Sequence, residues 1–150
     1  MCAPVWIFLI NVAGTLCLTG LIWAVQLVHY PAFSFICDSR FSAFERFHQR
    51  RISWIVVPLM CAELLSSVLL VWWRPSFVPG WCVALGLAAV GVIWISTFAL
   101  QVPLHARLTK AKDEETICRL VRTNGIRTVA WTARSGVLVW ILSRGLGNAL

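Results

Sequence analysis

The chain has 150 residues, enough for one domain, yet 59% of them are hydrophobic, 13% are charged, and the mean hydropathy is +0.80. Soluble domains carry about 25% charged residues, so this composition excludes the water-soluble classes. The net charge of +7 comes from basic residues placed between apolar runs, which argues against nucleic-acid binding. No charged side chain other than histidine occurs from Met1 to Cys37, as expected for a stretch in lipid.

Four apolar segments are long enough to cross a bilayer, whose hydrocarbon core needs about 20 apolar residues in a helix. They cover residues about 5–28, 52–73, 81–100 and 126–142. The first lacks the basic region and cleavage site of a signal peptide, so we expect it to be retained. The predicted fold is an all-α integral membrane four-helix bundle with up-down-up-down topology, a single transmembrane domain over residues 1–150.

The distribution of basic residues predicts the orientation of the bundle. Ten of the thirteen lie in two connections: Arg40, Arg46, Arg50, Arg51, Arg107, Lys110, Lys112, Arg119, Arg122 and Arg127. Only Arg74 and Arg144 lie on the opposite side. Because short cytoplasmic loops carry excess Lys and Arg, we expect loops 30–51 and 102–126 in the cytoplasm and both termini outside, as in a bacterial inner membrane.

Aromatic residues near the span ends fit two interfacial belts. The predicted outer belt contains Trp6, Trp72, Trp73, Trp81 and Trp140, and the inner belt contains Tyr30, Trp54 and Trp131. Pro58 and Pro103 lie inside spans and predict kinks.

Each cytoplasmic connection is predicted to contain a short helix. Ser42 and Glu45 match a capping box, and phenylalanines follow at every third position (Phe41, Phe44 and Phe47). This pattern indicates an interfacial helix over residues 43–51 that runs into the second span. In residues 113–123 an acidic start and a basic end favour a second helix, followed by a bend at Asn124 and Gly125. We expect the acidic run to be a solvated first turn, not a metal site.

The six cysteines show neither a C-x-x-C pair nor zinc-like spacing. They are Cys2, Cys17, Cys37, Cys61, Cys82 and Cys118. We expect them to be inert, which disfavours a thiol–disulfide oxidoreductase.

The two halves of the chain echo each other. The first span ends in Gln26-Leu-Val-His29-Tyr-Pro31 and the third in Gln101-Val-Pro103-Leu-His105; the second opens with Arg50-Arg51-Ile-Ser-Trp54 and the fourth with Arg127-Thr-Val-Ala-Trp131. Two parallel hairpins would place these sequences at the same membrane face.

This repeat gathers polar residues at the inner end of the bundle. They are His29, His48 and His105 with Gln26, Gln101, Arg51, Asn124 and Arg127. A polar interface explains any one of them, but the whole set indicates a site, since polar residues inside the hydrocarbon boundary are usually functional or paired. We expect these three histidines, Asn124 and Arg127 to line one pocket, with the rings of His29 and His105 within about 12 Å.

Two ionisable residues lie deeper in the predicted spans. Glu63 is nine residues past Trp54, and Arg134 three past Trp131. A charge near mid-bilayer is costly, so we expect Glu63 to be protonated, paired or facing a cavity. Arg134 could reach Glu63 or extend to the interface, and the pair could be structural or catalytic.

The second half resembles a known membrane family at Gln101-Val-Pro-Leu-His105 and Asn124-Gly-Ile-Arg127-Thr128. It is similar to the small four-span family that includes the fungal anthrone oxygenases, in which a Pro-Leu-Asn-like turn closes span three and Asn-x-x-Arg-Thr opens span four. His105 replaces the Asn. The resemblance covers about residues 98–142 and adds His29-Tyr-Pro31 in the first half; the chain as a whole is similar to bacterial members.

The resemblance implies an oxygenase that acts on an apolar polycyclic phenol or ketone from the bilayer, anthrone-like or quinol-like, without an established organic cofactor. Its catalytic residues would be His29, His105, His48, Asn124 and Arg127, and its substrate contacts Gln26, Gln101, Arg51, Glu63 and Arg134. A neutral histidine, His29 or His105, suits the base that removes an acidic C–H proton. Arg127 and Asn124 suit the developing oxyanion.

Two alternatives stay open from the sequence. His29, His48 and His105 could bind a metal ion or haem, or the protein could be a non-enzymatic permeation or assembly protein with Glu63 and Arg134 in a polar path. The cofactor, the substrate and any homo-oligomer are not fixed by the sequence.

Overall fold

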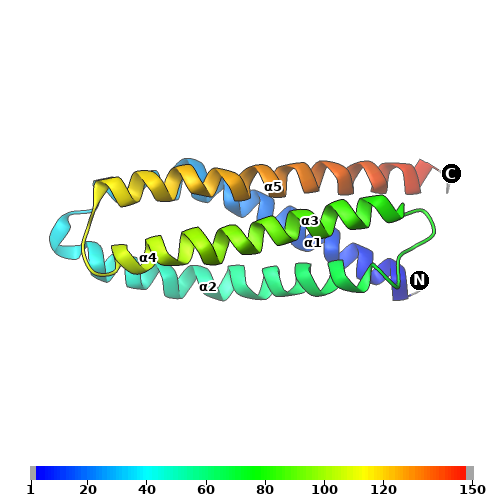
Figure 1. Ribbon diagram of the computed structural model, residues 1–150, viewed down its shortest axis with the longest axis horizontal. Coiled ribbons are helices and arrows are strands. Elements are labelled where there is room, and N and C mark those ends of the chain that lie inside the picture. The colour runs from blue at the N-terminus through cyan, green and yellow to red at the C-terminus, as the bar shows by residue number, and fades with distance from the viewer. Residues whose placement is uncertain (1–2, 148–150) are drawn as a thin grey trace.

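The computed structural model describes residues 3–147, and all regular structure in that range is helical. Four long helical rods, formed by residues 3–35, 38–69, 80–108 and 114–147, lie side by side (Figure 1). In chain order the elements are α1 (Ala3–Ala24), the π-helical turn η1 (Val25–His29), the 3-10 turn η2 (Pro31–Phe35), α2 (Asp38–Leu69), α3 (Gly80–Ser96), the π-helical turn η3 (Thr97–Gln101), α4 (Val102–Leu108) and α5 (Glu114–Gly147). The predicted all-α helical bundle is confirmed.

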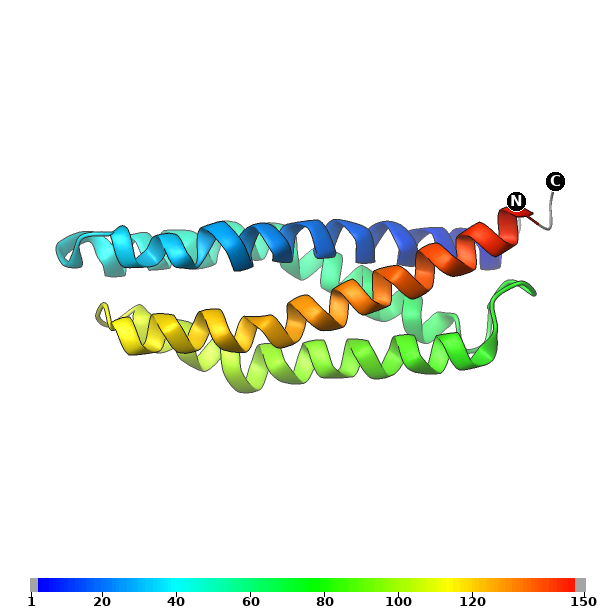
Figure 2. The same ribbon diagram turned by 90° about the horizontal axis from the view of Figure 1, so that it is seen from above.

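Successive rods run in opposite directions (Figures 1 and 2). The η2–α2 and α4–α5 connections lie at one end, which we call the basic end. The α2–α3 connection lies at the other end, near Ala3 and Gly147. The two connections rich in Lys and Arg therefore share one end.

Three helical segments are long and apolar enough to cross a membrane: Ala3–Phe35, Asp38–Leu69 and Gly80–Leu108. Their outward faces remain apolar, since Leu27, Leu65 and Ile95, one in each segment, are 61–70% exposed. The predicted fourth span, 126–142, lies inside α5, which within residues 3–147 does not meet the same measure of apolarity. Arg127 and Arg134 interrupt it, and both are buried in the bundle.

The helices at the basic end are longer and more continuous than predicted. The capping box is wrong: α2 begins after Cys37, so Ser42 lies inside the helix and Glu45 is fully buried. Residues 43–51 lie inside α2 and run on into the second span, as predicted, whereas residues 114–123 are the first turns of α5 rather than a separate short helix. The bend at Asn124–Gly125 is also wrong, because both residues lie in uninterrupted helix and the Asn124 side chain bonds inside the bundle.

Two prolines follow π-helical turns by one residue. Pro31 comes after η1 and Tyr30, and Pro103 after η3 and Val102. Proline has no N–H to donate to an α-helical hydrogen bond. The wider π turn before each proline lets the helical path continue up to that residue instead of ending abruptly. Pro58, in contrast, lies within continuous α2.

The core divides into two clusters along the bundle. The larger, at the basic end, includes Phe33, Phe41, Leu120 and Trp131; the smaller, at the opposite end, includes Phe8 and Ile141. Tyr30 and Trp131 were predicted in the inner belt, but they are 4% and 1% exposed and belong to the interior, where Tyr30 hydrogen-bonds His105 and Trp131 hydrogen-bonds the buried Glu63. The cysteines of the described range form no disulfide; Cys2 lies outside that range.

Candidate functional site

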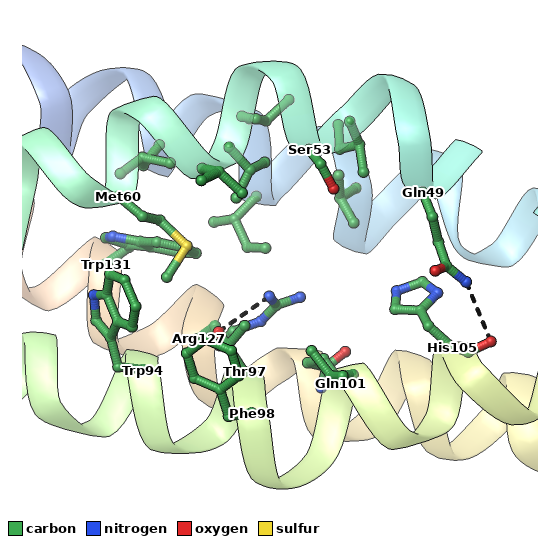
Figure 3. A pocket seen from close by; sticks show the side chains of 18 of the residues that line it. Gln49, Ser53, Met60, Trp94, Thr97, Phe98, Gln101, His105, Arg127 and Trp131 are labelled. Carbon is green, nitrogen blue, oxygen red and sulfur yellow. Dashed lines mark hydrogen bonds between the residues drawn. The ribbon is translucent and has the colours of Figure 1, made fainter. Parts of the chain in front are cut away.

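A cavity of about 310 Å³ lies between α2 and the η3 region, within the half of the bundle nearer the basic end. Most of its walls are apolar. Figure 3 shows Met60, Trp94 and Trp131 at one end of the cavity and Gln49 and His105 at the other, so a bound molecule would meet an aromatic end and a polar end.

The cavity opens sideways rather than along the bundle. Four lining residues are themselves exposed on the outer surface: Ser53 and Val57 of α2, Phe98 of η3, and Val102 of α4. They come from the two rods that flank the cavity. Its mouth therefore lies between α2 and the η3 region, on the apolar flank of the bundle.

His105 is held at the polar end by two hydrogen bonds. Its Nδ1 lies 2.5 Å from Glu45 Oε1, and its Nε2 lies 2.9 Å from the Tyr30 hydroxyl. Because a carboxylate can only accept, Nδ1 carries the proton and Nε2 accepts from Tyr30. A carboxylate that orients a histidine in this way is the arrangement of a general base.

Arg127 lines the same cavity, 6% exposed, with neutral partners. Its Nε and Nη2 donate to Asn124 Oδ1 (3.1 and 2.5 Å), and longer contacts of 3.4 Å reach the hydroxyls of Thr97 and Tyr30. Across residues 3–147 no carboxylate lies within 4.0 Å of its guanidinium. A buried charge without a counter-ion is costly, and here it faces an open cavity.

The three histidines form one group. His48 lies in the middle, with ring centroids 4.4 Å from His29 and 5.7 Å from His105, so the predicted spacing of His29 and His105 is confirmed. The predicted common pocket is wrong in part. His105 and Arg127 line the cavity, but His29 and His48 bond each other behind Tyr30, with 2.7 Å between His29 Nε2 and His48 Nδ1.

This group is not arranged as a metal site. Within the described part of the chain, no cluster of three His, Cys, Asp or Glu side chains has a geometry suited to a metal ion. Both nitrogens of His105 and the facing nitrogens of His29 and His48 are already hydrogen-bonded to one another or to Glu45 and Tyr30.

The predicted amide residues support the site rather than line it together. Asn124 is fully buried and holds Arg127, while its Nδ2 donates to Gln26 Oε1 at 2.7 Å. Gln101 does line the cavity, and it donates to Thr123 at 2.9 Å. Arg51 lies apart from the site, exposed, with its guanidinium 5.4 Å from the Phe47 ring.

Glu63 and Arg134 form an ion pair, with 3.1 Å between Arg134 Nε and Glu63 Oε1. This pairing was one of the alternatives predicted from the sequence. Both are buried, and Arg134 also donates to Asn11, Ser67 and the carbonyl of Gly86. The second oxygen of Glu63 accepts from the indole of Trp131 at 3.1 Å. The pair thus touches the cavity only through that ring.

Two residues of the site, Glu45 and Tyr30, were assigned other roles from the sequence. Glu45 was placed in a capping box and Tyr30 in an aromatic belt, because those local patterns explain each residue alone. Their positions did carry a signal: Glu45 lies three residues before His48 on one helix face, and Tyr30 follows His29.

Comparison of the chain with protein-family models, with curated proteins and with solved structures finds no match. Its function must be argued from the cavity itself.

Proposed function

We propose that the protein is an integral membrane protein whose four rods all cross the bilayer, α5 included. The three apolar segments and the exposed apolar flanks support this, and α5 can accompany them because its two arginines face inward. The positive-inside rule places the basic end in the cytoplasm and both termini outside. The cavity mouth then faces the acyl chains.

We further propose that the cavity takes up an apolar ring compound with a ketone or phenol oxygen and that the protein oxidises it as an anthrone-oxygenase-like enzyme. The observation that carries this proposal is Arg127, a buried cation without a carboxylate partner in the described chain, facing an apolar cavity beside His105. An oxygen that becomes negative during the reaction would supply the missing counter-charge.

The hydrogen bonds of the site support a route for this oxidation. His105 Nε2 takes a proton from the ring CH₂ through the Tyr30 hydroxyl, and the electron pair moves onto the ketone oxygen beside Arg127. The enolate carbon then reduces molecular oxygen and forms a C–O bond. Return of the proton and loss of water turn CH₂ and O₂ into C=O and H₂O. Glu45 stabilises the imidazolium formed at His105.

Protein reconstituted in liposomes tests this proposal with anthrone as the probe. Oxygen uptake and anthraquinone formation should exceed those of protein-free liposomes. His105→Gln and Arg127→Gln should each lower the rate by about a hundredfold or more, whereas Arg51→Gln, at an exposed position, is the matched control. Equal rates in all four proteins, each verified as folded, would overturn the proposal.

A further inference from the structure

The pair formed by His29 and His48 has no part in lining the cavity, yet its geometry is specific. The 2.7 Å bond between His29 Nε2 and His48 Nδ1 requires one ring to donate and the other to accept. His48 is 5% exposed, whereas His29 is partly exposed at the end of η1. The pair therefore leads from the buried site towards the surface at the basic end.

His48, the buried member of this pair, lies next to the proposed catalytic residues His105 and Glu45. The His48 ring lies 5.7 Å from the His105 ring, and Glu45 precedes His48 by one helical turn on α2. Glu45 Oε1 accepts from His105 and from Gln49 at 2.9 Å. Its Oε2 is buried and has no hydrogen-bond partner in the described chain. An unpartnered carboxylate oxygen at full burial is costly, which calls for a donor at this point.

We infer that His48 and His29 form a proton-exchange path that joins Glu45 and His105 to water at the basic end, with one water molecule between Glu45 Oε2 and His48. This inference rests on the proposed function. A proton taken from the substrate passes from His105 Nδ1 to Glu45, then to His48 and His29, and another from water returns by the same groups. No electrons move along the path.

The groups that surround His29 and His48 favour proton transfer between the two rings over proton transfer to other groups. Phe33 packs edge-on against both rings, with centroids 5.5 Å from His29 and 5.3 Å from His48, and Phe44 lies 6.4 Å from His29. The charged and titratable groups near the pair are Glu45, His105 and Tyr30, with Arg127 beyond Tyr30. The rings of Phe33 and Phe44 cover part of the pair with apolar surface, which offers no other group that could accept a proton.

The test measures whether an abstracted proton exchanges with solvent. Liposomes in D₂O under argon, with anthrone as the probe, should incorporate deuterium at the ring CH₂ faster than protein-free liposomes. His48→Phe and His29→Asn should each slow that incorporation by at least about tenfold, because the abstracted proton then returns to the carbon it left. Tryptophan quenching by anthrone should still report binding, since neither residue lines the cavity. Phe47→Leu, at an exposed position of α2, is the matched control.

The outcomes separate the two proposals. If the wild-type protein binds anthrone but gives no exchange above background, the proposed base is wrong. If the wild-type protein exchanges and both histidine variants exchange at the same rate, the path is overturned while the base stands. His48→Gln, which keeps a polar side chain of similar length without a titrating ring, should behave like His48→Phe.

Discussion

Arg127 and Arg134 are buried in the same helix, but their partners assign them different roles. Arg134 pairs with Glu63 and donates hydrogen bonds to four further groups, so its guanidinium is neutralised and hydrogen-bonded within the protein. Arg127 has neutral partners and faces the cavity. Arg134 therefore holds the helices together, whereas Arg127 is available to a ligand in the cavity.

Removing one member of the Glu63–Arg134 pair should be more damaging than removing both. Glu63→Gln or Arg134→Met alone leaves the partner desolvated, a loss of about 3–5 kcal/mol when a pair is buried. The double variant should recover part of this loss, measured by thermal unfolding in detergent. Strictly additive losses would show that the two side chains do not interact.

Gly86 has a specific steric role beside Arg134. A Cβ at this position would lie 2.8 Å from Arg134 Nη1, whereas a Cβ at Gly91, further along α3, would meet nothing within 4 Å. Gly86→Ala should therefore cost about 1–3 kcal/mol of stability. Gly91→Ala should be neutral or stabilising, because alanine favours helix. Equal melting temperatures of the two variants would contradict the tight contact.

Helix boundaries at the basic end show where local sequence patterns were insufficient. Ser42 and Glu45 fit a capping box, but burial of Glu45 against His105 decides the structure there, and that contact joins positions 60 residues apart. The acidic run at 113–115 was interpreted correctly as a helix start: Asp113 accepts from the backbone N–H of Thr116 at 3.1 Å and from its hydroxyl.

Asp113 should therefore stabilise the start of α5. The hydrogen bond from the Thr116 hydroxyl lowers the pKa of the Asp113 carboxyl. A depressed carboxyl pKa means that the contribution is present above the unfolded-state value, about 3.9, and is lost as pH falls through the folded-state value. Asp113→Ala should lower the melting temperature at pH 7, and Asp113→Asn should retain most of it. A lower melting temperature for Asn than for Ala would refute this capping role.

The parallel repeat explains how much of the site was predictable. The lengths of the apolar runs predicted the long helices. Because the first and third rods run in the same direction, His29 and His105 were expected at the same end of the bundle. Which side chains face the cavity was not predictable, because η1 and η3 shift the helical phase just before Pro31 and Pro103. A count at 3.6 residues per turn therefore misplaces the residues beyond each π turn.

The orientation of the bundle in a membrane can be tested with thiol reagents. Cys37 and Cys118 are exposed near the basic end, while Cys82 is buried and unsuitable as an outer marker. Ser76→Cys places a thiol in the exposed α2–α3 connection. An impermeant maleimide should label this thiol in intact cells and should label Cys37 and Cys118 only after lysis. The reverse pattern would invert the proposed orientation.

The occupant of the cavity decides whether the proposed function is right. The most direct measurement is an experimental structure of the protein in lipid nanodiscs with anthraquinone, a stable ring ketone. We predict ring density between α2 and the η3 region, against Trp94 and Trp131, with a ketone oxygen about 2.7–3.2 Å from the Arg127 guanidinium. A structure in which lipid or side chains fill the cavity at saturating anthraquinone, or in which Arg127 pairs with a carboxylate instead, would contradict the account.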